Sequence, residues 1–340
     1  MSEDSPTRVT ITGGSVVPAN ALPGGDFQSV DSYQQRLLQF AVTLAPNQGT
    51  GQPVKFAGSN SNTVTLEGFR ASVRIENAGA PAKVQSRVLI YGLNDTTIQQ
   101  LSVLGIVFNS IQKNAIKISA GNPTAGFSAV FGGTIWSAMA DYNKAPDVPF
   151  VVQAQSGYIN QVIPIPASSF PQSTDVATMM SGFAAQYPLG FENNGVTVQL
   201  PPSYFPGTLD QQIRRAAKAA NINAEIVDGG TKLAIWPVGG SRTSLTSVPL
   251  ISKTSGMIGY PVPSPNGYLI VRNLFNPQIA FGGTVQVQSD VVPQANRSWV
   301  VQKMDLELDS LIPKGQWRQV LYCYPVGFPA PPPPPAGGAT

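Results

Sequence analysis

Residues 63–77 read TVTLEGFRASVRIEN, and their pattern indicates the fold class of the chain. Val64 and Leu66 alternate with polar residues before Gly68, and Val73 and Ile75 alternate with polar and charged residues after it. Successive side chains of a β-strand point to opposite faces, so a period of two predicts strands with one buried face. The segment therefore predicts two strands of a sheet that faces a core on one side.

Similar β-type runs flank this segment, with Gly, Asn and Pro between them. In the first half of the chain they cover residues 37–44, 82–90, 115–119, 126–137 and 148–154. Short alternating runs separated by turn residues are typical of a barrel or a sandwich. One short helix is predicted between these runs, at residues 96–104.

Residues 173–187, STDVATMMSGFAAQY, change the period from two to that of a helix. Ser173, Thr174 and Asp175 are suited to cap its start, since their side-chain oxygens can accept from free backbone N–H groups. The apolar residues recur at the i, i+3, i+4, i+7, i+8 and i+11 spacing of an amphipathic helix. They are Val176, Met179, Met180, Phe183, Ala184 and Tyr187.

A second helix with a capping-box start at Thr208 and Gln211 follows, and Leu209, Ile213, Ala216, Ala217 and Ala220 would form its apolar face. Each helix precedes a predicted hairpin, with turns at Asn194-Gly195 and at Asp228-Gly229-Gly230. Residues 172–200 and 208–237 thus predict a duplicated helix–hairpin α/β domain. No glycine-rich phosphate loop joins a strand to a helix there, so a cofactor-binding unit is disfavoured.

From about residue 245 the β-type runs return, at residues 268–272, 284–289, 299–308 and 317–324. The sequence therefore predicts a mainly β chain in which two β domains bracket an α/β insert. The predicted parts are an N-terminal arm at 1–33, a first β domain at 34–160, the insert at 161–244, a second β domain at 245–325 and a proline-rich tail at 326–340. Pro331–Pro335 predict a stiff polyproline strut of roughly 15 Å, which is either a ligand for an aromatic groove or an untethered end.

The composition excludes several kinds of chemistry. The chain has no histidine and a single cysteine, Cys323, which leaves no imidazole base, no Ser–His or Cys–His pair, no histidine-ligated metal and no internal disulfide. Only 11% of the residues are charged, against roughly 25% in ordinary soluble domains. We therefore expect no catalytic, cofactor-binding or metal-binding residues, and surfaces that contact other protein.

The charge pattern does not favour nucleic-acid or membrane binding. The formal net charge is only +3, and the densest basic group, Arg214, Arg215 and Lys218, is interpreted as the solvated face of a helix. Residues 1–6 lack the basic region and apolar core of a secretory signal, and apolar stretches such as Val103–Phe108 are too short to span a membrane.

One constellation could still carry carboxylate chemistry. Asp305, Glu307 and Asp309 alternate with apolar residues, so they would share one face of a strand. Carboxylates held together can bind a hard cation or act as an acid–base pair. Same-face positions on a strand are ~6.6 Å apart and no second cluster is evident, so a solvated or intersubunit-paired face is favoured. Cys323, between two tyrosines, is interpreted as a small buried hydrophobe.

An ordered series of motifs resembles the baseplate hub proteins of contractile-tailed bacteriophages, over about residues 30–325. In the C-terminal third they are Gly256–Pro261, Leu274–Pro277, Phe281–Ser289, Trp299–Val301, Leu306–Ser310 and Pro313–Trp317; earlier ones are Arg70–Val73, Val130–Gly133, Pro206–Leu209 and Ile235–Pro237. None of these motifs is catalytic, so the resemblance lies in their order.

The resemblance implies a homotrimer with two tube-like β-barrel domains per chain, arranged around a channel. One end would contact the sixfold tail tube or a tube-initiator protein, and the other a threefold membrane-piercing spike. Other baseplate proteins would surround it, DNA would only pass through, and the chain would not insert stably into a membrane. It would be assembled in the bacterial cytoplasm and reside in the virion tail.

Two other classes of protein remain open. A carbohydrate-degrading or carbohydrate-binding tail protein would need a cleft with two carboxylates and stacking aromatic side chains. A capsid or secretion-apparatus structural protein would share the physics of assembly, and only the family resemblance separates it from a hub.

Overall fold

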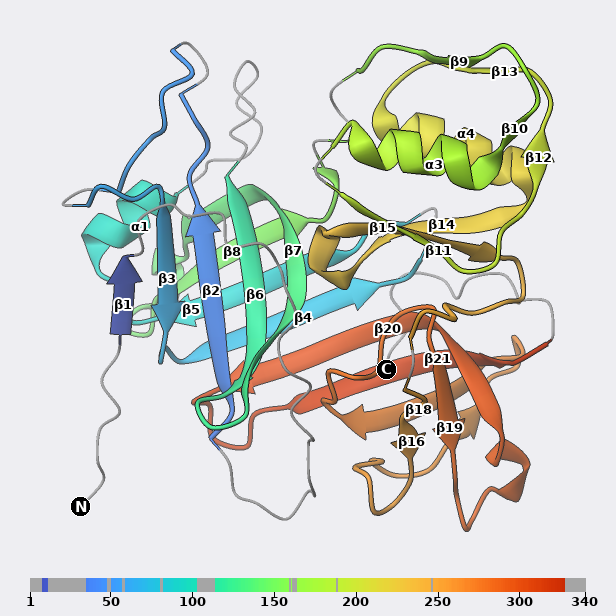
Figure 1. Ribbon diagram of the computed structural model, residues 1–340. Coiled ribbons are helices and arrows are strands. Elements are labelled where there is room, and N and C mark those ends of the chain that lie inside the picture. Colours follow the sequence, from blue (N-terminus) through green and yellow to red (C-terminus); the bar gives the residue numbers. More distant parts are fainter. Residues whose placement is uncertain are drawn as a thin grey trace. The chain divides into compact units, whose positions relative to one another are not determined.

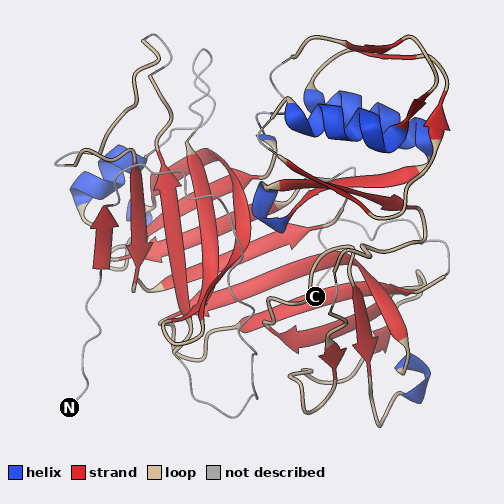
Figure 2. Ribbon diagram, viewed as in Figure 1, coloured by secondary structure: helices blue, strands red, loops and turns tan. Residues whose placement is uncertain are grey.

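A computed structural model describes residues 8–11 and 35–327, apart from 48–49, 57–58, 80–81, 103–113, 159, 161–163, 188 and 246. The described residues form two compact units. Unit 1 contains those up to Ile75 together with Gln85–Ser156 and Leu306–Trp317, and unit 2 contains Glu76–Val84, Gly157–Asp305 and those from Arg318 onward. Strands predominate over helices (Figure 2), so the chain is mainly β with an α/β insert, as predicted.

Parts of several predicted segments lie outside the described residues. These are most of the N-terminal arm at 1–33, the apolar stretch Val103–Phe108 and the proline strut Pro331–Pro335. The domain boundaries at residues 34, 161, 245 and 326 stay predictions.

Unit 1 is built on an antiparallel sheet (Figure 1), whose strands follow the order β1-β3-β2-β6-β7-β8-β5-β4, with β20 next to β4. The strands are β1 (Arg8–Ile11), β2 (Leu37–Thr43), β3 (Thr63–Glu67), β4 (Ala71–Asn77), β5 (Gln85–Tyr91), β6 (Ala115–Asn122), β7 (Gly126–Ala140), β8 (Pro149–Gln155) and the C-terminal part of β20 (Ser298–Ser310). Every β-type run predicted between residues 37 and 154 is therefore a strand.

The period of two explains the core of unit 1. Phe40 of β2 lies opposite Leu66 of β3 on one side and Ile118 of β6 on the other. All three side chains are fully buried, whereas their neighbours along β2 and β3 are partly exposed and Lys117, before Ile118, is exposed. The same face of the sheet therefore supplies the core, and burial of each such side chain contributes about 1.5–3 kcal/mol.

The short helix predicted at 96–104 is α1 (Asp95–Leu101). Asn94 caps it, because its side chain accepts a hydrogen bond from the backbone N–H of Thr97 at 2.8 Å. Ile98 and Leu101 are its buried residues, so three-residue spacing directs one face of the helix inward.

The insert in unit 2 places helices α3 (Val176–Ala185) and α4 (Leu209–Ala220) on one face of a three-stranded sheet (Figure 1). That sheet has the order β11 (Gly190–Asn193), β15 (Lys232–Pro237), β14 (Ile222–Val227). Two short antiparallel ribbons complete the insert. They pair β9 (Ser168–Phe170) with β13 (Ser203–Phe205), and β10 (Thr174–Asp175) with β12 (Gln199–Leu200).

Both helices begin as predicted. Asp175 caps α3 by accepting from the N–H of Thr178 at 3.1 Å. Thr208 and Gln211 form the reciprocal capping box of α4, and Asn221 ends that helix in the left-handed conformation. The apolar residues predicted for the two helices are buried in one shared core, with Tyr187 packed against it.

The hairpin predicted at Asn194-Gly195 is wrong. Strand β11 pairs in parallel with β15, and β12 pairs with β10 instead of turning back on β11. Asn194 extends the contact with β15, because its backbone N–H and its side-chain amide both donate to the carbonyl of Ile235. Asn side chains compete with regular backbone pairing in this way. The second predicted hairpin, β14–β15 around Asp228-Gly229-Gly230, is confirmed.

The remaining strands of unit 2 include the four runs predicted after residue 245 and two short strands that were not predicted, at 250–251 and 262–263. They are β16 (Leu250–Ile251), β17 (Val262–Pro263), β18 (Leu269–Leu274), β19 (Thr284–Val287), the N-terminal part of β20 and β21 (Trp317–Pro325). The sheet order is β20-β21-β18-β17, and β19 joins β16 to β20. Their core contains Val271, Val301 and Leu321, each fully buried. None of the helices in the described part of the chain has the length and apolar character needed to cross a membrane.

Candidate functional site

The carboxylate row predicted for one strand lies on β20, and Asp309 is its best-defined member. Asp309 accepts hydrogen bonds from Ser72 Oγ at 2.7 Å, from Arg74 Nη1 at 2.9 Å and from the backbone N–H of Gln316 at 2.7 Å. Its side chain is only 8% exposed. The expectation of a solvated or intersubunit-paired face is therefore wrong for Asp309, because donors from β4 and the β20–β21 turn already surround it.

The charge state of Asp309 follows from these contacts. Burial by itself raises its pKa, but the hydrogen bonds from Arg74, Ser72 and Gln316 outweigh burial and leave the pKa lowered. A carboxyl group that stays ionised at neutral pH is a poor general acid. Asp305 in turn forms an ion pair with Lys303 at 3.2 Å. Among the described residues, no three Cys, Asp or Glu side chains are placed to hold a metal ion.

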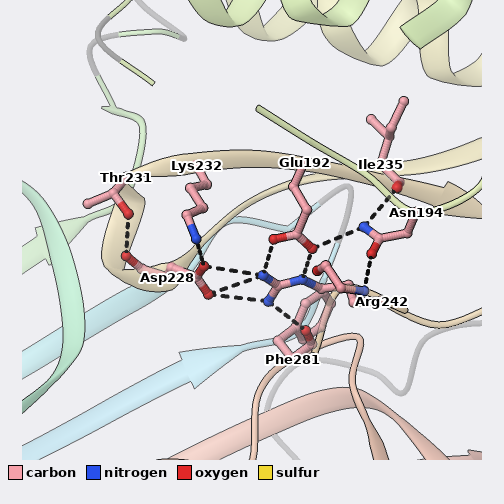
Figure 3. Close-up of polar contacts among 9 residues, drawn as sticks. Glu192, Asn194, Asp228, Thr231, Lys232, Ile235, Arg242 and Phe281 are labelled. Atoms are coloured by element: carbon pink, nitrogen blue, oxygen red, sulfur yellow. Dashed lines mark hydrogen bonds and ion pairs between the residues drawn. The ribbon is translucent and has the colours of Figure 1, made fainter. Parts of the chain in front are cut away.

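A different ionic cluster is centred on a buried cation, Arg242 (Figure 3). Arg242 makes a two-pronged contact with Glu192, with Nε and Nη2 each 2.8 Å from one carboxylate oxygen. Its Nη1 and Nη2 also donate to Asp228 at 3.2–3.3 Å. The Arg242 side chain is 1% exposed, that of Glu192 11% and that of Asp228 33%. The buried guanidinium of Arg242 thus forms ion pairs with two carboxylates.

Neighbouring polar groups fix the position of the cluster. Asn194 donates to Glu192 Oε1 at 3.0 Å (Figure 3). It also accepts from the N–H of Ser244 at 2.9 Å. The backbone N–H of Arg242 donates to the carbonyl of Gly282 at 2.8 Å. Gly282 has φ +74, and a Cβ there would lie 3.1 Å from the Arg242 side chain. The cluster therefore attaches the chain after β15 to both β11 and the loop before β19.

The pKa shifts within this cluster indicate a structural role. Arg242 is the main cause that lowers the pKa of Glu192 to about 2, against a smaller opposing effect of burial. Burial alone lowers the pKa of Arg242, yet the two carboxylates together raise it. Glu192 and Arg242 therefore both stay charged at neutral pH, which makes neither of them suited to proton transfer. Arg242 was not predicted, although it is the only charged residue between Lys232 and Lys253.

Of the predicted basic group on α4, Arg214 is paired with a carboxylate, whereas Arg215 and Lys218 are exposed. Arg214 pairs with Asp210 at 2.7 Å, and Asp210 also pairs with Lys83. Arg215 donates to the carbonyl of Pro206 at 2.7 Å and is exposed, as is Lys218. Because Arg214 is already paired with a carboxylate, this face has few cations left to bind a phosphate backbone.

One small pocket of unit 2 contains aromatic residues, but their faces are covered. Trp236, Phe281 and Tyr324 line it and are 4%, 7% and 2% exposed. Trp236 and Phe281 pack edge to face at 6.2 Å, and Tyr324 donates to the carbonyl of Gly240. Sugar stacking needs an accessible ring face, so this pocket does not favour carbohydrate binding.

Cys323 is a buried part of the core of unit 2, as predicted. It is fully buried in the same apolar cluster as Leu321 and Val271. Burial raises the pKa of its thiol. A thiol that stays protonated is a poor nucleophile, so Cys323 is chemically inert in the folded chain.

Unit 1 exposes large apolar side chains on one face of its sheet. Met139 of β7 lies beside Val151 of β8, which lies beside Leu89 of β5. Met139 is 44% exposed, and Trp136, at the irregularity where β7 shifts register against β8, is 39% exposed. Bulges of this kind re-aim a side chain, and exposed apolar groups often mark contact surfaces.

Solved structures share the fold of this chain. The 43 kDa tail protein of prophage MuSo2 from Shewanella oneidensis is 8% identical, with a TM-score of 0.50, and the match covers 85% of this chain and 98% of that one. The tail protein from Neisseria meningitidis MC58 is 10% identical, with a TM-score of 0.52, and the match covers 84% and 96%. No curated protein matches the sequence.

A family model described as baseplate hub gp41 matches residues 53–312. This span includes most of unit 1, the whole insert, the Arg242 cluster and most of the second β region. It contains the motifs from Arg70 to Ser310 on which the resemblance rested. The chain belongs to the baseplate hub gp41 family, whose members are structural proteins of the phage tail baseplate.

Proposed function

We propose that this chain is the hub of a contractile phage tail, and that three copies form a ring that joins the sixfold tail tube to a threefold membrane-piercing spike. The observation that carries the proposal is the family match over residues 53–312, since this span covers most of the chain. On this proposal the chain acts through shape and contacts and catalyses no reaction.

The chemistry of the described residues supports an assembly role. In the best-formed ionic clusters, Arg242 is paired with Glu192 and Asp309 with Arg74, and the lowered pKa values of Glu192 and Asp309 suit scaffolding better than proton transfer. With only 11% charged residues and exposed apolar side chains such as Met139, much of the surface suits contact with protein. Obligate interfaces commonly bury more than about 2,000 Å² and have apolar cores.

The ring would leave a channel through which DNA passes. A lining of uncharged Ser, Thr, Asn and Gln side chains would let the phosphate backbone move without being held, because affinity for DNA grows with each phosphate that Lys or Arg neutralises. A dense ring of Lys and Arg around the channel in the assembled tail would argue against this role.

The proposal is tested by measuring how many copies of the chain assemble together. Light scattering on the full-length chain should give three times the chain mass of 35.9 kDa, either alone or after co-expression with the tube and spike proteins of its own phage. Imaging of the intact tail should then place three copies between tube and spike. A monomer in both preparations, or a six-copy ring in the tail, would overturn the proposal.

A further inference from the structure

Strand β17 (Val262–Pro263) ends the sheet of unit 2 within the described residues, with β18 as its neighbour. Two prolines, Pro261 and Pro263, alternate with Tyr260 and Val262 along this edge. Proline has no backbone N–H, so its place in a strand determines which side of the strand can pair.

The pairing with β18 shows which side each residue faces. Val262 lies opposite Ile270, Pro263 lies opposite Leu269, and the N–H of Ser264 donates to the carbonyl of Tyr268 at 2.7 Å. In an antiparallel pair, the backbone groups of alternate residues point toward the partner and those between point away. The groups of Val262 and Ser264 therefore face β18, and Pro261 and Pro263 occupy the positions that face away.

Both outward positions thus lack the donor that a further strand would need. At Pro263 this edge is otherwise open to pairing, since Val262 is 48% exposed and Pro263 is exposed, whereas Pro261 is buried. No charged residue lies between Lys253 and Arg272, so the edge has none of the charges that commonly protect such strands. By contrast, β1 (Arg8–Ile11), the terminal strand of the sheet in unit 1, contains no proline.

We propose that Pro261 and Pro263 close the β17 edge to strand addition, so that copies of this chain cannot join through it. An exposed apolar edge with free N–H groups is a template for pairing with another chain. Removal of the outward donors limits assembly to the remaining surfaces of the molecule. A part that must assemble to a fixed number of copies needs such a stop, because pairing through this edge would join assemblies that have to stay separate.

The proposal can be tested by restoring one outward backbone N–H to the β17 edge. Pro263 is exposed, so Pro263→Thr returns an outward N–H and a residue that favours strands, with little effect on the core. The matched control is Pro265→Thr, which returns an N–H in the exposed turn beyond the strand. Light scattering over a concentration series should show about a twofold rise in weight-average mass over wild type for Pro263→Thr and none for the control.

A second variant separates strand pairing from general loss of solubility. Pro263→Lys also restores the N–H but places a charge on the edge, which opposes pairing, so its mass should equal that of wild type. Equal melting temperatures would show that all the variants are folded. If Pro263→Thr keeps the mass of wild type at every concentration, or if Pro263→Lys associates as strongly, the proposal is wrong.

Discussion

The two carboxylate clusters of this molecule differ in how they could be recognised. The row at Asp305, Glu307 and Asp309 is visible in the sequence because its members alternate along one strand. Glu192 and Asp228 are 36 positions apart and become neighbours only through Arg242. Yet the two clusters differ most in the burial of their cations: Arg242 is 1% exposed, whereas Arg74, the partner of Asp309, is 41% exposed. Regular spacing reveals which side chains share a face, and burial decides which of them stabilise the fold.

The largest expected effect comes from Arg242→Met. This change removes the cation that pairs with the buried Glu192 and one of the two cations that pair with Asp228. The loss of one partner of a buried pair destabilises a protein by about 3–5 kcal/mol. Denaturant unfolding of the full chain measures the difference. Lys232→Ala is the matched control: Lys232 pairs with the same Asp228 at 3.2 Å but is 49% exposed, so we expect a loss below about 1 kcal/mol. Equal losses for the two variants would show that burial does not govern this cluster.

A smaller effect is expected from acid. The pKa of Glu192 is about 2 in the folded chain, against an ordinary value of 4.5. A carboxyl group whose pKa is lowered by folding stabilises the protein above its ordinary pKa, and this stabilisation is lost as the pH falls through the lowered value. Stability should therefore decline between about pH 4.5 and 2, and Glu192→Gln should flatten that decline. An unchanged slope in this variant would contradict the assignment.

The smallest effect is expected from Asp309→Asn. The amide keeps the shape of the side chain and can still accept from Ser72, but it loses the charge that Arg74 pairs with. Because Arg74 is partly exposed, we expect a loss of about 1–2 kcal/mol, which is less than for Arg242→Met. Thermal unfolding of the two variants side by side gives the order. A larger loss for Asp309→Asn would reverse the comparison between the clusters.

Local patterns predicted most of the secondary structure. Alternation predicted the strands between residues 37 and 154, and helical spacing with capping residues predicted α3 and α4. These features depend on neighbours within a few residues, which the sequence displays directly. The same reasoning failed at Asn194-Gly195, where the dipeptide favours a turn but the Asn side chain bonds to Ile235 of a distant strand.

The sequence by itself determined the longer strands and the helices, which of their faces are apolar, and that histidine and internal disulfide chemistry are absent. Its ordered motifs also indicated the family. Tertiary structure alone decided the parallel pairing of β11 with β15 and the ion pairs of Arg242 and Asp309. Arg242 is buried between Glu192 and Asp228, and Asp309 pairs with Arg74. The physical reason is separation along the chain. Periodicity reports only contacts within one element, whereas these contacts join residues between 14 and 235 positions apart that meet only when the elements pack.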